Sequence, residues 1–270
     1  MSAPQNARLA GVQMVSGALV AENLALAARL LAQAADAGAQ LAALPEFFPI
    51  LDDDAAARFA ASEPFGAGLI QDWLQETALR HRLWLCAGSI PLRSDTPGRI
   101  YNSALVFDPT GVCRARYDKI HLFAFDNGRE HYDEAASILP GDTPVALETP
   151  FGRIGLSICY DLRFPELYRA LGTPDLILVP AAFTERTGRD HWEILLRARA
   201  IENQCYLLAP AQGGRHPNGR RTHGNSLILD PWGDILDRKG KGCGLVIAEL
   251  DHQRIREVRQ RFSRPKTGDR

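Results

Sequence analysis

Short apolar runs alternate with longer amphipathic stretches along the chain, and this alternation predicts its elements. The first half predicts strands at 8–14, 41–44, 83–88 and 102–107, with helices at about 19–37 and 67–81. The second half predicts strands at 153–159, 175–179, 205–210 and 225–229, with helices at about 165–171 and 190–203. The strand runs are short and almost wholly apolar, which is typical of strands buried on both faces.

A faint internal repeat relates the two halves, because the elements follow the same order in both. Asn102-Ser103 leads through an apolar strand to the turn Asp-Pro-Thr-Gly at 108–111, and Asn225-Ser226 leads to Asp-Pro-Trp-Gly at 230–233. Proline presets φ in such a turn and glycine closes it. Duplicated strand–helix units predict an α/β protein with two sheets packed face to face and helices outside. This is a four-layer α-β-β-α sandwich with pseudo-duplicated halves.

The domain organisation follows from the absence of linkers. No stretch rich in glycine, serine or proline interrupts residues 9–250, so we predict a single domain over 1–270 with its core at about 7–250. A chain of 270 residues can bury a large core. The segment from about 254 to 270 is polar, and we expect it to form an exposed arm or a partner-binding segment.

Composition excludes several function classes. The net charge of -1 is evenly interspersed, which favours neither nucleic acid nor an anionic membrane as a partner. There is no signal-like start and no apolar run near the roughly 20 residues that span a bilayer, so we expect a cytoplasmic protein. The five cysteines have irregular spacing and no C-x-x-C, which indicates reduced thiols rather than disulfides or structural zinc. Without HExxH, GxGxxG or Walker motifs, we expect chemistry without a metal or cofactor.

Cys159 stands where the buried run 154–159 stops, and Pro165-Glu166 suits the first turn of a helix shortly after it. At such a corner we expect the thiol to be exposed and next to free backbone N–H groups. These conditions lower a thiol pKa and can hold an oxyanion. The remaining cysteines are interpreted as small core residues: Cys86, Cys113, Cys205 and Cys243.

Two charged residues follow apolar or strand-like segments in the first half. Glu46 ends the segment 41–46, and Phe47 and Phe48 come after it as an apolar wall that would raise a carboxyl pKa toward that of a useful base. Lys119 ends the strand-like segment 114–119. The alternatives are a surface carboxylate at Glu46 and an ordinary surface ion pair between Lys119 and its neighbour.

These three segments, LPEFF, YDKIHLF and ICYDLRFPEL, resemble the nitrilase superfamily of carbon–nitrogen hydrolases over about residues 9–249. The resemblance implies a catalytic triad of Glu46, Lys119 and Cys159, with Glu134 in HYDEAASILPG as a second glutamate. The later runs HWEILLRARAIENQCY and NSLILDPWG are most similar to the amidase branch related to deaminated glutathione amidase. The fold implied is the same four-layer sandwich, usually assembled as a homodimer or larger homo-oligomer.

The implied reaction is hydrolysis of a small amide that carries a carboxylate, through a thioester. Deaminated glutathione is the first candidate substrate and 2-oxoglutaramate the second. Candidate substrate-binding residues are Tyr160, through its backbone N–H, Arg163, Phe183 and Arg186. An arginine suits the carboxylate through paired hydrogen bonds, with Arg197, Arg199 and Arg215 as further candidates.

Each assignment has an alternative. Glu134 also fits a solvated loop, and Arg163 could tie the corner through an ion pair with Glu166. His121 offers a rival Cys-His dyad near Lys119. The whole chain could also be a catalytically silent scaffold, or a redox sensor, although no second cysteine lies near Cys159 in sequence to resolve an oxidised thiol.

Overall fold

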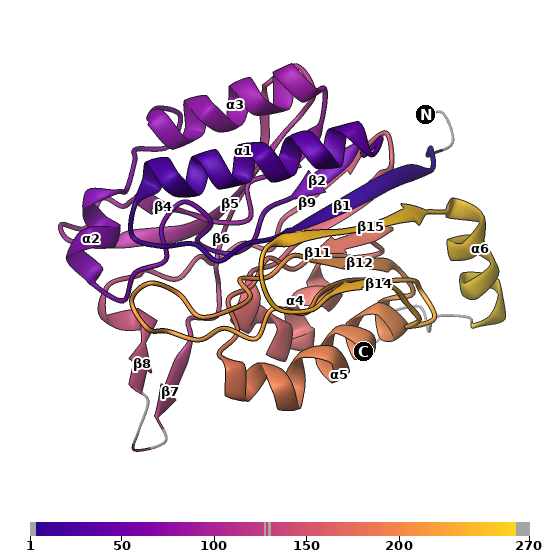
Figure 1. Cartoon of the computed structure of the whole chain (residues 1–270). Coiled ribbons are helices and arrows are strands. Elements are labelled where there is room, and N and C mark those ends of the chain that lie inside the picture. Colours follow the sequence, from indigo (N-terminus) through magenta and orange to yellow (C-terminus); the bar gives the residue numbers. More distant parts are fainter. Residues whose placement is uncertain (1–3, 127, 129–130, 263–270) are drawn as a thin grey trace.

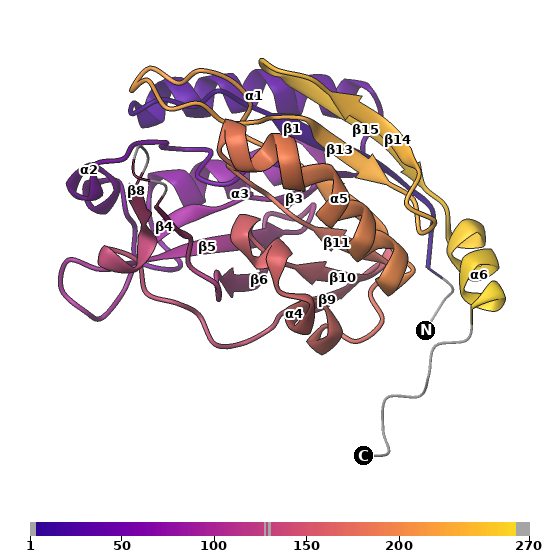
Figure 2. The same cartoon turned by 90° about the horizontal axis from the view of Figure 1, so that it is seen from below.

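The computed structural model describes residues 4–126, 128 and 131–262 and arranges them in four layers (Figure 1). Helices α1 (Val20–Asp36) and α3 (Leu69–His81) form one outer layer. Two sheets lie in the middle, and α4 (Pro165–Ala170) and α5 (Glu185–Asn203) cover the other side (Figure 2). The predicted α-β-β-α sandwich is confirmed.

The first sheet has seven strands in the order β15-β1-β2-β3-β5-β4, with β6 paired to β5. Its strands are β1 (Ala7–Gln13), β2 (Leu41–Ala43), β3 (Trp84–Cys86), β4 (Ile90–Arg93), β5 (Ile100–Phe107), β6 (Cys113–Asp118) and β15 (Gly244–Leu250). β1, β2 and β3 run parallel, and the other pairs are antiparallel. The parallel strands match the apolar runs found in the sequence.

The second sheet has six strands in the order β14-β13-β12-β11-β10-β9. They are β9 (Ala146–Thr149), β10 (Gly152–Leu156), β11 (Leu176–Leu178), β12 (Tyr206–Ala209), β13 (Ser226–Leu229) and β14 (Ile235–Lys239). β10, β11 and β12 run parallel and β13 is antiparallel to β12, as β5 is to β3. The internal repeat is therefore present in the topology.

Several elements differ from the sequence prediction. The strand predicted to reach 159 ends at Leu156, and Cys159–Arg163 form the 3₁₀ turn η2. α5 begins at Glu185 rather than 190, because the Thr184 hydroxyl caps it by accepting from the N–H of Thr187. Also present are α2 (Ala55–Ala60), the hairpin β7 (Ala124–Asp126) with β8 (His131–Asp133), and the 3₁₀ turn η1 (Glu134–Ala136).

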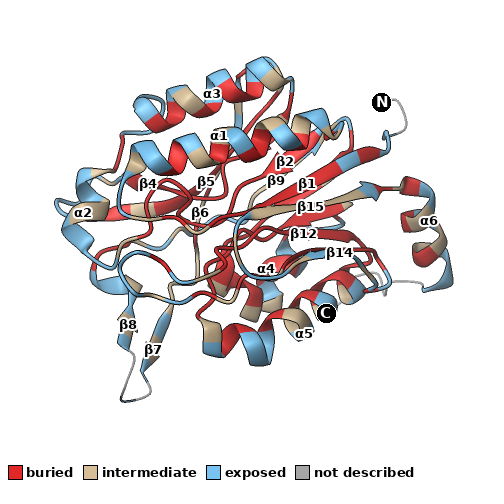
Figure 3. Cartoon of the chain, viewed as in Figure 1, coloured by how far each residue is buried: buried red, intermediate tan, exposed pale blue. Residues whose placement is uncertain are grey.

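The expectation of an exposed arm from 254 is wrong for its first part. Residues His252–Arg261 form helix α6, which buries Ile255 and Val258 against the body of the protein (Figure 3). The rest of the predicted tail, 263–270, lies outside the described residues. None of the helices in the described ranges has the length and apolarity needed to cross a bilayer.

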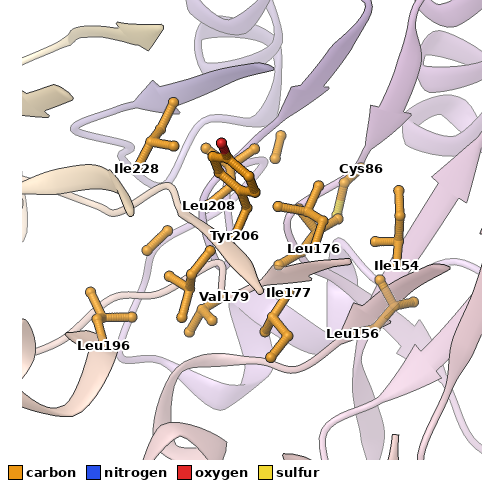
Figure 4. Packing of buried hydrophobic residues seen from close by; sticks show 14 of the residues in the cluster. Cys86, Ile154, Leu156, Leu176, Ile177, Val179, Leu196, Tyr206, Leu208 and Ile228 are labelled. Atoms are coloured by element: carbon orange, nitrogen blue, oxygen red, sulfur yellow. The ribbon is translucent and has the colours of Figure 1, made fainter. Parts of the chain in front are cut away.

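One core cluster fills the space between the sheets and continues under α4 and α5, and a second lies between the first sheet and helices α1 and α3. Along β2, Leu41 and Ala43 join the cluster between the sheets, while Ala42 joins the cluster under α1 and α3. This alternation is the two-residue period of a strand. Figure 4 shows part of the inter-sheet cluster, where Cys86 of the first sheet lies among residues of the second such as Ile154. Burial on both faces explains why these strands are apolar throughout.

The two repeated turns are built in the same way. The Asp108 carboxylate accepts hydrogen bonds from two backbone N–H groups of its own turn and from Nε of Arg114 at 2.6 Å. Asp230 does the same in its turn and accepts from Nε of Arg254 at 2.7 Å. Burial alone would raise the pKa of Asp108, but the hydrogen bonds outweigh it and lower the pKa to about 2.

We expect Asp108→Ala and Asp230→Ala each to lower the free energy of unfolding by about 1–3 kcal/mol, because buried N–H groups lose their acceptor. Urea denaturation measures this, with the exposed loop variant Asp95→Ala as a control expected to stay within about 0.5 kcal/mol. The depressed pKa of Asp108 means that its contribution is complete above its ordinary pKa of 3.8 and fades as the pH falls toward 2. A difference from wild type that stays constant down to pH 2 would contradict this account.

Candidate active site

The predicted triad residues meet where strands of both halves end. Glu46 follows β2, Lys119 follows β6 directly, and Cys159 follows β10 in the opposite sheet. Nζ of Lys119 lies 2.8 Å from Oε1 of Glu46 and 2.8 Å from Oε2 of Glu134. The Cys159 thiol lies in the same hollow as Glu46, and the charges of Glu46 and Lys119 both act on it. The structure therefore brings together all four residues that the sequence selected.

Backbone contacts fix Glu46 at the end of β2. The next strand passes so close that a Cβ on Gly88 would lie 2.1 Å from the carbonyl oxygen of Pro45, and Gly88 has φ +63°. Only glycine suits that position without strain. The Ser89 hydroxyl accepts from the N–H of Phe47 at 2.9 Å. From the second half, Nε2 of Gln212 donates to the backbone carbonyl of Glu46 at 3.1 Å, which joins the halves at this point.

Lys119 has a fully buried side chain between two carboxylates. Burial alone would lower its pKa, but the charges of Glu134 and Glu46 outweigh burial and hold the pKa well above its ordinary value. Lys119 is therefore a permanent cation. Glu134 also accepts from the N–H of Phe123 at 2.8 Å, which orients its carboxylate and argues against a merely solvated loop position.

Cys159 opens η2 with φ +50°, a left-handed value that is uncommon for residues other than glycine. Its N–H donates to the carbonyl of Pro180 at 2.9 Å. The Asp161 carboxylate accepts from the N–H of Ile158 at 2.9 Å, so the chain is held on both sides of the strained residue. The Cys159 residue is 7% exposed. The expectation of an exposed thiol is wrong.

The expectation of a lowered thiol pKa is wrong too. Burial, followed by the charge of Glu46, raises the pKa of Cys159 well above its ordinary value, and Lys119 counteracts this only in part. Lys119 cannot offset these two effects, because its single positive charge already faces two carboxylates. At neutral pH the thiol keeps its proton, and Glu46, which lines the same hollow and whose charge acts on the thiol, is the carboxylate in position to accept it when the sulfur attacks.

Two connected hollows open beside these residues. We call one the cysteine hollow, because Cys159 lines it together with the candidates Tyr160, Arg163 and Phe183. The other, the wide hollow, measures about 380 Å³. The hollows share five lining residues: Glu46, Phe123, Glu134, Ala182 and Arg220. Arg186 is exposed on α5 and lines neither hollow, unlike the other three candidates.

Arg163 lies across two aromatic rings rather than against Glu166. Its guanidinium carbon is 5.6 Å from the ring centroid of Tyr160 and 5.4 Å from that of Phe183, and Nη1 and Nη2 each lie 3.2 Å from Nδ1 of His191. Among the described residues no ion pair joins Arg163 to Glu166. Arg163 therefore places a positive charge at the wall of the cysteine hollow.

The His121 ring, the alternative base for Cys159, has other partners. The His121 ring lies 2.7 Å from the Asp161 carboxylate through Nδ1 and stacks on Phe164 with ring centroids 3.7 Å apart. His121 lines neither hollow, whereas Glu46 lines both and Cys159 lines one of them. The geometry favours Glu46 over His121 as the base.

The structure also adds residues that the sequence did not single out. Arg58 on α2 lines the wide hollow, and Arg220, in the loop between β12 and β13, lines both hollows. Neither belongs to a motif, so only tertiary structure could reveal them. All five cysteines are free thiols, but Cys243 is exposed, which corrects its assignment to the core. Within the described ranges, no group of three or more His, Cys, Asp and Glu residues could hold a metal ion.

Comparisons with known proteins cover nearly the whole chain. The carbon-nitrogen hydrolase family model matches residues 8–260. A deaminated glutathione amidase of Synechocystis sp. is 43% identical over 266 residues, which cover 94% of either chain. The omega-amidase NIT2 of Homo sapiens is 33% identical, over 94% of this chain and 92% of the relative. The crystal structure of the C. elegans NitFhit protein matches with a TM-score of 0.86 and 34% identity over 96% of this chain, which spans 64% of that longer protein.

We expect Glu46→Gln to change turnover and thiol reactivity in opposite directions. Turnover should fall by about 10²-fold or more because the base is lost. Alkylation of Cys159 by iodoacetamide at pH 8 should become faster, because the variant loses a charge that raises the thiol pKa. Mass spectrometry of the peptide carrying Cys159 measures the alkylation, and the exposed variant Glu166→Gln serves as control. Slower alkylation in Glu46→Gln would mean that Glu46 already activates the resting thiol.

Proposed function

The chain belongs to the carbon–nitrogen hydrolase family, and from this premise we propose that it hydrolyses deaminated glutathione through a thioester on Cys159. The observation that carries the chemistry is the buried Lys119 ammonium in contact with two carboxylates, both of which line the hollow that holds the thiol. A nucleophile, a base and a fixed positive charge are thus assembled on one site, which is what hydrolysis of an unreactive amide requires.

In the first half-reaction the Cys159 sulfur attacks the amide carbonyl carbon while its proton passes to Glu46. The carbonyl oxygen becomes an oxyanion, which Nζ of Lys119 and the backbone N–H of Tyr160 stabilise. Removing one such donor typically costs about 2.7–4 kcal/mol. Glu46 then gives its proton to the nitrogen, the C–N bond breaks and the amine leaves. The acyl group stays on Cys159 as a thioester.

In the second half-reaction water attacks the thioester carbonyl. Glu46 takes a proton from that water and returns it to the sulfur as the C–S bond breaks, so the acid is released and the resting thiol is restored. Lys119 stabilises the second oxyanion as it did the first. Glu134 keeps Lys119 in place, since it contacts the ammonium in addition to Glu46 and is itself fixed by the N–H of Phe123.

The substrate proposal rests on the relatives and on the cations of the site. The more similar relatives are deaminated glutathione amidases, and the omega-amidase matches at lower identity. Both substrates present a short acyl chain ending in a 2-oxo acid, and Arg163 supplies a cation at the wall of the cysteine hollow for that carboxylate. They differ in the leaving group, which is cysteinylglycine in one case and ammonia in the other. The omega-amidase reaction on 2-oxoglutaramate is the second candidate.

We expect kcat/KM to be at least about tenfold higher for deaminated glutathione than for 2-oxoglutaramate, a difference of about 1.4 kcal/mol. The shared acyl group cancels from the ratio, so the ratio reports on the leaving-group side alone. Assays of released amine or ammonia measure it. Cys159→Ala should abolish both activities, while Cys205→Ala, which removes a buried thiol elsewhere, should keep them.

Other outcomes of that assay select other functions. Equal rates would favour the omega-amidase reaction, and efficient nitrile turnover would overturn the amidase branch. A wild-type chain that hydrolyses neither amide would favour the silent scaffold. Activity in Cys159→Ala would contradict the covalent mechanism.

We further propose that the protein is a homo-oligomer, most simply a dimer, of single-domain subunits in the cytoplasm. Both halves build one active site, which supports a single domain, and five free thiols suit a reducing compartment. Ile194 and Ile201 are 71% and 49% exposed on the outer face of α5. Trp232, 42% exposed, and Phe262, 50% exposed, lie with ring centroids 5.4 Å apart. Such exposed apolar residues are typical of a surface that another subunit covers.

We expect sedimentation at micromolar concentration to show a dimer or larger closed assembly. Ile194→Asp and Ile201→Asp should weaken it at least about tenfold, because each places a charge in an apolar interface. Leu79→Asp provides the matched control, since Leu79 is 55% exposed on α3 in the opposite outer layer. A wild-type monomer, or equal weakening by the control, would contradict the proposed surface.

A further inference from the structure

The wide hollow is larger than an ammonia leaving group requires. At about 380 Å³ it falls within the range of about 300–1,000 Å³ that is common for small-molecule sites. It meets the cysteine hollow along Glu46 and Glu134, so a substrate whose carbonyl carbon lies at Cys159 can extend into it. An occupant of the wide hollow can therefore be part of the same molecule as the reacting amide.

Two arginines from distant parts of the sequence line this hollow. Arg58 donates from Nη1 to the backbone carbonyl of Asp52 and from Nη2 to the Ser137 hydroxyl at 3.2 Å. Arg220 donates from Nη1 to Oδ1 of Asp53 at 3.1 Å. Each arginine also has a buried Nε–H without a hydrogen-bond partner anywhere in the described part of the chain.

An unpaired buried donor on a cation is costly. Leaving such a donor unsatisfied costs about 1–3 kcal/mol, and more when the group is charged. Burial lowers the pKa of Arg58 despite the raising effect of Glu134 and Asp53, which shows that the protein's own carboxylates do not fully compensate this cation. An anion bound in the wide hollow would compensate the charge of both guanidiniums, and a guanidinium matches a carboxylate with two parallel hydrogen bonds.

The acidic residues around the wide hollow are already engaged. Asp52 accepts from the N–H of Asp54 at 2.9 Å. Asp133 caps η1 by accepting from the N–H of Ala135 at 3.0 Å and is exposed. Asp53 is the direct partner of Arg220, but its side chain is 55% exposed, whereas that of Arg220 is 14% exposed. A pair this exposed on one side is worth at most about 1 kcal/mol, so Arg220 can give it up for an enclosed carboxylate.

We propose that Arg58 and Arg220 bind a carboxylate on the amine half of the substrate, so that the enzyme selects amides whose leaving group is a small peptide-like acid. This inference rests on the proposed function and adds a second anion site to it. Arg163 serves the acyl half from the cysteine hollow, while the leaving group is served by Arg58, which lines only the wide hollow, and by Arg220 at the junction of the two hollows. The distance between the two anion sites then sets the length of a substrate that can bind both.

The kinetic test compares carboxylate and carboxamide forms of one substrate. We use deaminated glutathione, its analogue with the glycine carboxylate converted to a carboxamide, and 2-oxoglutaramate, with wild type, Arg220→Gln, Arg58→Gln and Arg58→Lys. Wild type should lose about 10- to 100-fold in kcat/KM when the carboxylate is removed, as expected for hydrogen bonds to charged groups. The Arg58 and Arg220 variants should already have this lower kcat/KM with the carboxylate substrate. Conversion of the carboxylate to a carboxamide should then lower their kcat/KM little further.

The control variant is Arg259→Gln. Arg259 is a half-buried arginine on α6 whose Nη1 pairs with Asp175 at 3.0 Å, and it lines neither hollow. It should behave as wild type with all three substrates. On 2-oxoglutaramate the loss in the Arg58 and Arg220 variants should be at least about tenfold smaller than on deaminated glutathione, since ammonia carries no carboxylate. Arg58→Lys keeps the positive charge but lacks the guanidinium. Its circular dichroism reports whether the variant folds, and its carboxylate preference reports whether recognition is lost.

A binding experiment separates this inference from the proposed function, because it needs no turnover. N-acetyl-cysteinylglycine mimics the leaving group. Calorimetry should show that it binds wild type at least about tenfold more tightly than its C-terminal amide does. Arg220→Gln should remove this preference. If wild type shows the preference but does not hydrolyse deaminated glutathione, the proposed substrate fails and the anion site stands. The anion site fails if wild type shows no preference for the carboxylate. It also fails if the Arg58 and Arg220 variants lose equal factors of kcat/KM on the carboxylate and carboxamide substrates, or equal factors on deaminated glutathione and 2-oxoglutaramate.

Discussion

The buried ammonium of Lys119 is the charge on which the site depends. It holds Glu46 and Glu134 together in a place from which water is largely excluded, and removing one partner of such a buried group commonly costs about 3–5 kcal/mol. Because Glu46 and Lys119 belong to the first half and Cys159 to the second, the two sheets must pack in register for the thiol to reach its base. The inter-sheet core is therefore a condition for catalysis as well as for stability.

One cation between two carboxylates decides how the nucleophile works. The site carries an excess of negative charge before the thiol ionises, so a preformed thiolate is opposed by both burial and charge. Nucleophilicity appears only as the proton moves to Glu46, at the moment when the developing charge passes to the carbonyl oxygen facing Lys119. A resting thiol of this kind reacts slowly with chance electrophiles, and it reacts with an amide only when the substrate places its carbonyl oxygen near the ammonium.

The sequence predicted the parts of this protein that depend on local pattern. Parallel strands such as β2 and β11 are buried on both faces, so their apolar runs were visible, and the segment around Glu46 resembled a known family. The edge strand β14 alternates between half-buried and exposed positions and carries three charged residues, so no continuous apolar run marked it. The thiol pKa was mispredicted because the corner at Cys159 is covered by chain from elsewhere, including Pro180. Arg58 and Arg220 became visible only when the fold placed their segments around one hollow.

The left-handed backbone at Cys159 bears on how this chain has been selected. A side chain in that conformation costs roughly 1–2 kcal/mol relative to an ordinary backbone, and glycine would avoid the cost. Folding stability therefore works against a cysteine here, and a chain kept only for its surface would drift readily toward glycine at this position. A cysteine that the fold holds at a cost in stability is therefore explained by the chemistry of its thiol and not by its packing.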